Sequence, residues 1–159
     1  METAGAIVFL PREGNGRSLM LEDLLFEPAA MWLAEALRRA GVERFLVVCH
    51  QNDREEAATC FPQETEIITT GTEDANQRLC AFLTGCTGRV VVVTKPVQLM
   101  EEDVRTLLEE RPPRSSDDRE SGVCRIDAAA LAQALEEGED FETALRARAD
   151  RLGGGSIWL

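Results

Sequence analysis

The sequence contains little of what metal centres, membrane spans and nucleic-acid-binding surfaces need. Among its 159 residues it has one histidine, His50, and one lysine, Lys95. Its 29 acidic residues outnumber its 17 basic ones, so the formal net charge is −12. Nucleic acids and anionic membranes both bind basic surfaces, and we therefore expect neither as the main partner. No apolar run approaches the ~18 residues that a membrane-spanning helix requires.

The five cysteines are an odd number, and no two of them form a C-x-x-C pair. The apolar run at residues 6–10 is too short for the core of a secretory signal, and Glu2 lies just before it. These features favour free thiols and a cytoplasmic location. A single histidine with scattered cysteines has no zinc-ligand spacing, so we expect no metal site.

The pattern of apolar residues predicts strands and helices that alternate along the chain. We expect strands over residues 4–10, 44–50, 65–69, 88–94 and 122–126. We expect helices over residues 29–40, 51–61, 72–85, 101–110, 127–137 and 140–151. Gly41 suits the C-terminus of the first helix, and Asp127 suits the N-cap of the fifth. This alternation predicts a three-layer α/β domain with a doubly wound, mostly parallel sheet.

The segment RPPRSSDDRESG interrupts this alternation with two prolines and no apolar periodicity. We therefore expect an α/β core over 1–111, a polar linker over 112–121, and a strand with helices over 122–152 that complete the same domain. Residues 153–159 are expected to be a flexible tail. Its apolar end, Trp158 and Leu159, either docks on the domain or marks a contact with a partner.

Ligands of doubly wound sheets bind at the carboxyl ends of the strands, near the point where the strand order reverses. The loops after Leu10, His50 and Thr94 are therefore expected to surround a pocket. The first of these loops contains Gly14-Asn15-Gly16-Arg17, in which glycines allow backbone N–H groups to approach a phosphate closely. The alternative interpretation is a simple turn between a strand and a helix.

Other polar and aromatic residues near this edge have ordinary structural interpretations. His50 is expected to be a polar strand terminus, with a general base as the alternative, and Cys49 a core residue. Met31 and Trp32 are expected to pack in the core. We expect a solvated, acidic helix start without a metal role at the following residues: Asp53, Glu55 and Glu56.

Four segments, in order along the chain, resemble the nucleotide-sugar pyrophosphorylases, a family of nucleotidyltransferases. FEPAAMWLAEALRRAGVERFLVVCH is similar to the family's K-P-M helix and the strand after it, and TGTEDANQRLCAFL to its L-G-T-G-x-A helix start. RVVVVTKPVQLM is similar to its strand ending in G-D-x-P-L, and ESGVCRIDAAALAQAL to its N-T-G-I-Y-x-F-D segment. The resemblance runs from about Ala6 to Leu135, lacks a central section of the family, and is greatest to the uridylyltransferase half of the bacterial bifunctional N-acetylglucosamine-1-phosphate enzyme.

The resemblance implies the nucleotide-diphospho-sugar transferase fold and a set of nucleotide-binding residues. Arg17 stands where a basic side chain of the family contacts phosphate. Gly71 and Thr72 match the Gly-Thr pair that contacts the base, although this pair is also ordinary helix-capping sequence. The nucleotide-binding residues implied in this way are Leu10, Gly14, Gly16, Arg17, Gly71 and Thr72.

The sequence departs from the family at positions that bind the metal ion, the phosphates and the sugar. Lys95 replaces an aspartate that ligates the catalytic Mg²⁺, and an ammonium group cannot coordinate that ion. Glu13 puts a negative charge among residues that meet phosphates, and Pro11 is bulkier than the small residues usual there. Glu27 replaces a lysine, and Glu120 replaces an asparagine that contacts the sugar.

These departures predict a degenerate nucleotidyltransferase-like protein without Mg²⁺-dependent transfer and without a cofactor. It is expected to bind a nucleotide or nucleotide-sugar, or to act with a protein partner. One alternative is an active transferase that makes a nucleotide-sugar and pyrophosphate from a nucleoside triphosphate and a sugar 1-phosphate. In that enzyme Mg²⁺ would be the cofactor, and Arg17 and Lys95 would be the catalytic cations. The other alternative is a pure protein-interaction module with a vestigial pocket.

Overall fold

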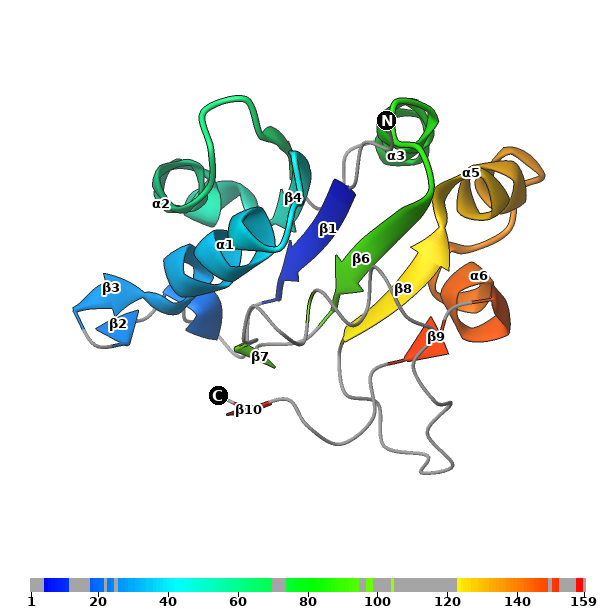
Figure 1. Ribbon diagram of the computed structural model, residues 1–159. Coiled ribbons are helices and arrows are strands. Elements are labelled where there is room, and N and C mark those ends of the chain that lie inside the picture. The colour runs from blue at the N-terminus through cyan, green and yellow to red at the C-terminus, as the bar shows by residue number, and fades with distance from the viewer. Residues whose placement is uncertain are drawn as a thin grey trace.

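The protein has three layers, a central sheet and helices on both of its faces, as Figure 1 shows for the computed structural model. The structure describes residues 5–11, 18–21, 23–24, 26–69, 74–94, 97–98, 104, 123–148, 150–151 and 157–158. The expected helix over 101–110 is described only at Val104, and the expected linker over 112–121 lies outside the described residues.

The central sheet has six strands in the order β5-β4-β1-β6-β8-β9. Its strands are β1 (Gly5–Leu10), β4 (Arg44–Cys49), β5 (Glu66–Thr69), β6 (Arg89–Val93), β8 (Val123–Asp127) and β9 (Asp150–Arg151). β5, β4, β1 and β6 run parallel to one another, whereas β8 is antiparallel to β6 and to β9. The predicted α/β class with a doubly wound, mostly parallel sheet is confirmed.

The helices are divided between the two faces of the sheet (Figure 1). α1 (Ala29–Arg39) and α2 (Arg54–Cys60) cover one face. α3 (Ala75–Thr84), α5 (Ala128–Glu136) and α6 (Phe141–Arg148) cover the other. No helix in the described part of the chain has the length and apolar character needed to cross a membrane.

Several short elements connect these layers. Two 3-10 turns are present, η1 (Leu19–Leu21) and η2 (Gln51–Asp53). Two pairs of short antiparallel strands are β2 (Asp23–Leu24) with β3 (Glu27–Pro28), and β7 (Val97–Gln98) with β10 (Ile157–Trp158). The second pair joins the C-terminal end of the chain to the segment after β6.

The core consists of two apolar clusters, one on each face of the sheet. Along β1, Ala6 and Val8 belong to the cluster under α1, and Ile7 belongs to the cluster under α3 and α5. Successive side chains of a strand point to opposite faces, so a strand buried on both sides needs an unbroken apolar run. This is why the sequences GAIVFL and RVVVV form the centre of the sheet.

α1 is amphipathic, and its sequence explains both its packing and its end. Leu33 and Leu37 are fully buried on the sheet side. After Arg39 the chain turns at Gly41, whose φ of 110° favours glycine, and the Val42 N–H donates to the Leu37 carbonyl at 3.0 Å. This is the Schellman ending predicted for the helix. The prediction that Trp32 packs in the core is wrong, because its side of the helix faces solvent and the residue is 39% exposed.

The prediction of a helix over 140–151 is wrong at its C-terminal end. α6 ends at Arg148, and Asp150 and Arg151 form β9 instead. In this strand Asp150 pairs with Arg125 and Arg151 pairs with Cys124 of β8. An edge strand offers unpaired N–H and C=O groups, and pairing with them outweighs local helix propensity.

Candidate functional site

Three neighbouring strands of the sheet end together and define its carboxyl edge. Leu10 of β1 lies beside Cys49 of β4, and Val8 lies beside Val93 of β6. The chain continues from β1 to β4 on one side of β1, while β6 lies on the other side. The strand order therefore reverses between β1 and β6, which is where doubly wound sheets bind their ligands.

Of the predicted site residues, the structure describes Leu10 alone. Its side chain is 2% exposed and packs in the cluster under α1, so only its backbone can meet a ligand. The other predicted residues lie outside the described residues: Gly14, Gly16, Arg17, Gly71, Thr72 and Lys95. Their roles remain predictions. The strands that precede them, β1, β5 and β6, are parallel and end at the same edge.

Asp53 lies at this edge in an environment that the sequence did not predict. We expected a solvated residue, but Asp53 is fully buried. The η2 turn after β4 directs it inward, and the Asp53 N–H donates to the His50 carbonyl at 2.9 Å. The neighbouring Glu55 and Glu56 are exposed, as expected. The error arose because a polar residue after a strand is usually solvated, and nothing local in the sequence marks this one as buried.

The Asp53 carboxylate holds the end of the glycine-bearing loop. Its Oδ2 accepts a hydrogen bond from the Ser18 N–H at 3.4 Å. Ser18 is fully buried too, and its hydroxyl oxygen accepts from the Met20 N–H at 3.3 Å. The Ser18 carbonyl accepts from the Leu21 N–H at 3.0 Å, which closes the η1 turn. The residues described on the two sides of segment 12–17, the end of β1 and Ser18, are therefore both held by the surrounding structure.

His50 terminates β4 and caps the turn after it. Its Nδ1 accepts a hydrogen bond from the Asn52 N–H at 3.1 Å. The interpretation of His50 as a polar strand terminus is confirmed.

Cys49 is a core residue, as predicted, and its surroundings keep its thiol neutral. It is fully buried. Burial raises the pKa of the Cys49 thiol to about 11, the carboxylate of Asp53 also raises this pKa, and the Arg54 guanidinium lowers it. A neutral thiol is a weak nucleophile, so Cys49 is unsuited to nucleophilic catalysis at neutral pH.

At the carboxyl edge, the residues that the structure describes offer no set of ligands that fits a catalytic Mg²⁺ ion. Within the described ranges, no group of three or more His, Cys, Asp or Glu side chains could hold a metal ion. The carboxylate of Asp53 accepts from Ser18. The residue after Thr94 in the sequence is Lys95, whose ammonium group is a cation and not a ligand. We therefore derive no step through a metal ion.

Comparison with family models and with curated protein sequences finds no match. Solved structures do match. A nucleotidyl transferase from Methanothermobacter is 15% identical, with 94% of this chain and 85% of that chain covered and a TM-score of 0.59. A hypothetical transferase from Thermus thermophilus is 20% identical, with coverage of 92% and 74% and a TM-score of 0.58. A 4-diphosphocytidyl-2C-methyl-D-erythritol synthase from Anaerococcus prevotii is 10% identical, with coverage of 92% and 82% and a TM-score of 0.55.

These likenesses define the class of fold. The chain has the nucleotide-diphospho-sugar transferase fold and is nucleotidyltransferase-like in its architecture. At identities of 20% or less, the similarity concerns the fold, and activity has to be argued from the site.

Proposed function

We propose that this protein binds a nucleotide or nucleotide-sugar at the carboxyl edge of its sheet and has lost Mg²⁺-dependent transfer. The observation that carries the proposal is the buried hydrogen bond from Ser18 to Asp53, which fixes the end of the glycine-bearing loop beside β1. A loop whose two ends are fixed loses less conformational entropy when it closes around a ligand.

The phosphates would be bound by the loop between Pro11 and Ser18. Backbone N–H groups near Gly14 and Gly16 can cradle phosphate oxygens, and Arg17 supplies a guanidinium one residue before the buried anchor. The base would be bound by Gly71 and Thr72, which come two and three residues after the end of β5 in the sequence. The resemblance to the uridylyltransferases makes a uridine nucleotide or its sugar conjugate the first ligand to test.

Loss of transfer follows from Lys95. Transfer to a sugar phosphate releases pyrophosphate, whose developing charge Mg²⁺ offsets while it also orients the reacting oxygens. A lysine supplies one positive charge and no coordination geometry. Lys95 can therefore support binding of phosphates but cannot replace the metal in the reaction.

A thermal-shift panel of UTP, CTP, GTP and ATP, each with and without Mg²⁺, tests the proposal. We expect stabilisation by UTP that does not need Mg²⁺, and no release of pyrophosphate when a sugar 1-phosphate is added. A ligand at about ten times its Kd adds about 1.4 kcal/mol, which raises Tm by about 3 to 6 °C in a domain of this size. Arg17→Ala should abolish the shift, and Arg38→Ala, a change of an exposed arginine on α1, should leave it intact.

Other outcomes reject parts of the proposal. Mg²⁺-dependent release of pyrophosphate would make the protein an active nucleotidyltransferase. No shift with any nucleotide at millimolar concentration would reject nucleotide binding. Lys95→Asp separates two explanations for lost transfer. If it restores Mg²⁺-dependent binding, one metal ligand was the main loss, and if it changes nothing, the loss is distributed over the site.

A second candidate function, a protein-interaction module, is favoured by one observation. Phe26 is 99% exposed at the turn between β2 and β3, and its φ of 77° is unusual for a bulky residue. Strain that holds an aromatic ring in solvent is typical of functional positions. If no nucleotide binds and the protein co-purifies with a partner that Phe26→Ala releases, this function is the better one.

A further inference from the structure

A cavity lies at the opposite edge of the sheet from the candidate nucleotide site. Its volume is about 380 Å³, and residues from the start of β4, the segment before β5 and the end of α3 surround it. Its apolar surface comes from Phe45, Pro62 and Phe82. We call it the amino-edge cavity, because β4 and β5 begin there. The proposed nucleotide binding does not involve this cavity, so it does not explain why polar groups line it.

Arg44 lines this cavity and is held in one place by its neighbours. Its Nη1 donates to the Phe82 carbonyl at 3.3 Å, and its guanidinium carbon lies 5.0 Å from the centre of the Phe82 ring. A Cβ atom at Gly85 would overlap the guanidinium, so the glycine makes room for it. In the described part of the chain Arg44 has no carboxylate partner, unlike Arg78, whose Nε lies 3.3 Å from Glu66.

Thr65 contributes an unsatisfied hydroxyl group to the same cavity. Its hydroxyl oxygen is buried but has no hydrogen-bond partner. No other buried side-chain oxygen or nitrogen of the described residues lacks one. Its N–H is already used in a turn, where it donates to the Pro62 carbonyl at 2.9 Å. A buried hydroxyl without a partner costs free energy, and native proteins keep few of them.

Three glutamates line the cavity, and the charge of one of them, Glu66, is compensated by Arg78 at 3.3 Å. Glu43 and Glu64 both line it, both are exposed, and neither forms an ion pair with another described residue. They repel a simple anion that would otherwise bind Arg44, whereas Arg44 repels a simple cation that would otherwise bind them. A ligand that carries both charges satisfies both sets of groups.

We propose that the amino-edge cavity binds a small zwitterion of the amino-acid class with an apolar side chain. The ligand's carboxylate accepts hydrogen bonds from Arg44 and Thr65, and its ammonium group lies near Glu43 and Glu64. Its apolar part packs on Phe45, Pro62 and Phe82. This proposal does not depend on nucleotide binding at the other edge.

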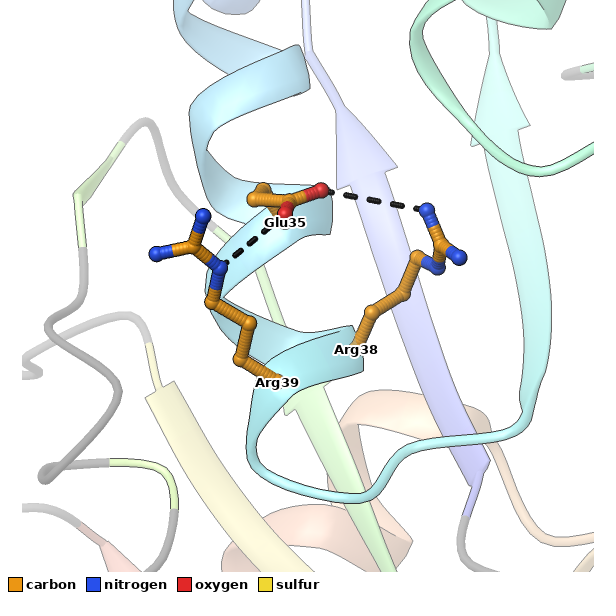
Figure 2. A network of polar contacts seen from close by, with 3 residues as sticks. All are labelled: Glu35, Arg38 and Arg39. Atoms are coloured by element: carbon orange, nitrogen blue, oxygen red, sulfur yellow. Dashed lines mark hydrogen bonds and ion pairs between the residues drawn. The ribbon is translucent and has the colours of Figure 1, made fainter.

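A neighbouring hollow of about 460 Å³ shows why this cavity is the better candidate. It is lined by Arg38 and Arg39 of α1, but both arginines already contact Glu35 (Figure 2). Arg39 Nε lies 3.0 Å from Glu35 Oε1, and Arg38 Nη1 lies 3.8 Å from Oε2. Their charge is compensated on the helix itself, whereas that of Arg44 is not.

The probes are L-leucine and L-phenylalanine, with two analogues of leucine that each lack one charge. Leucinamide has no carboxylate, and 4-methylpentanoate has no ammonium group. We expect at least one of the two amino acids to raise Tm at 10 mM and to bind at least tenfold more tightly than either analogue, as measured by calorimetry. The proposal is overturned if neither amino acid binds, or if an analogue binds as tightly as its parent.

Two variants test the assigned contacts on the full chain. Thr65→Val removes the unpartnered hydroxyl at nearly constant volume, so it should keep or raise the Tm of the free protein while it weakens amino-acid binding at least fivefold. Gly85→Ala displaces the Arg44 guanidinium without changing its charge and should weaken binding at least tenfold. Arg39→Gln, in the neighbouring hollow, is the control and should leave binding unchanged. Unchanged binding in Thr65→Val and in a folded Gly85→Ala protein overturns the proposal, and nucleotide shifts measured in parallel keep the two sites distinct.

Discussion

The backbone N–H of Ser18 donates a hydrogen bond to Oδ2 of Asp53 over 3.4 Å, between two fully buried residues that lie 35 positions apart. The contact joins the end of the glycine-bearing loop to the turn after β4. Burial of a carboxylate costs little free energy only where hydrogen-bond donors contact it. The buried Asp53 carboxylate and the buried Ser18 N–H therefore depend on each other.

Asp53→Ala should therefore lower the free energy of unfolding by about 2 kcal/mol, because it leaves the buried Ser18 N–H without its acceptor. Urea unfolding measures the change. Glu55→Ala, an exposed change two residues away, is the control and should stay within about 0.5 kcal/mol of the original protein. Equal effects of the two changes would contradict the structural role of Asp53. If the proposed function holds, Asp53→Ala should also weaken the UTP-induced thermal shift.

Phe26→Gly should stabilise the protein although it removes a large side chain. The ring is 99% exposed and loses no burial, and glycine adopts the observed φ of 77° without strain. Relief of about 1 to 2 kcal/mol of strain, less about 0.5 to 1 kcal/mol of added backbone entropy, leaves a gain of about 0.5 to 1 kcal/mol. Phe26→Ala is the matched control, because it removes the ring but keeps the Cβ atom. Identical stabilities of the two variants would show that the strain relieved is no larger than the entropic cost of glycine, which contradicts the expected gain.

The buried thiols should make stability fall at alkaline pH. The pKa of Cys49 rises from 9.0 to about 11 on folding, and burial also raises the pKa of Cys60, Cys80 and Cys86. Above pH 9 the unfolded chain loses these protons first, so the folded state binds more protons and the free energy of unfolding decreases with pH. This contribution is fully present below pH 9 and is lost as pH rises toward 11.

Few other side chains titrate between pH 9 and 11, because the chain has no tyrosine and one lysine. The change of stability with pH in this range can therefore be assigned to the cysteines. The expected slope from Cys49 is about 1 kcal/mol per pH unit between pH 9 and 11. Cys49→Ala should reduce the measured slope by about this amount. Cys80→Ala, a change at a less buried thiol, should reduce it less. A slope that does not respond to Cys49→Ala would rule out this assignment.

Asp127→Ala should destabilise the protein by about 1 kcal/mol. The Asp127 carboxylate accepts from the Ala130 N–H at 3.1 Å and so caps α5, as the sequence predicted. Asp127→Asn keeps an acceptor at the same place and should cost only a few tenths of a kcal/mol. Thermal unfolding of the two variants measures the difference, and a loss as large in the asparagine variant would assign the effect to charge instead of capping.

Prediction from sequence succeeded wherever a signal lies within one segment. The run RVVVV forms a buried strand because β-branched residues suit a strand covered on both faces, and Gly41 ends α1 because glycine accepts a positive φ. The glycine-bearing segment over residues 12–17 lies outside the described residues, so its conformation stays a prediction. Its role in binding phosphate stays a prediction.

Prediction failed where the outcome depends on a partner far away in the chain. Asp53 was expected in solvent, and the sequence around it does not reveal that Ser18 meets it 35 residues earlier in the chain. Asp150 and Arg151 were expected in a helix, but the free edge of β8 captures them as a strand. Trp32 lies on the amphipathic helix α1, and only the packing of this helix decides that the side with Trp32 faces solvent.

The sequence by itself determined the order of the main strands and helices and the mostly parallel α/β class, because these follow from residue type and local periodicity. The departures at Glu13 and Lys95 are implied by the resemblance to the nucleotide-sugar pyrophosphorylases. Only the tertiary structure decided which polar groups are buried and which stay unsatisfied. The Asp53 carboxylate accepts a hydrogen bond from the Ser18 N–H. At the amino-edge cavity the Arg44 guanidinium donates to the Phe82 carbonyl but has no carboxylate partner among the described residues, and the Thr65 hydroxyl has no hydrogen-bond partner among them. Burial and hydrogen bonding depend on contacts between residues that are far apart in the sequence, and the local pattern of residues does not specify these contacts.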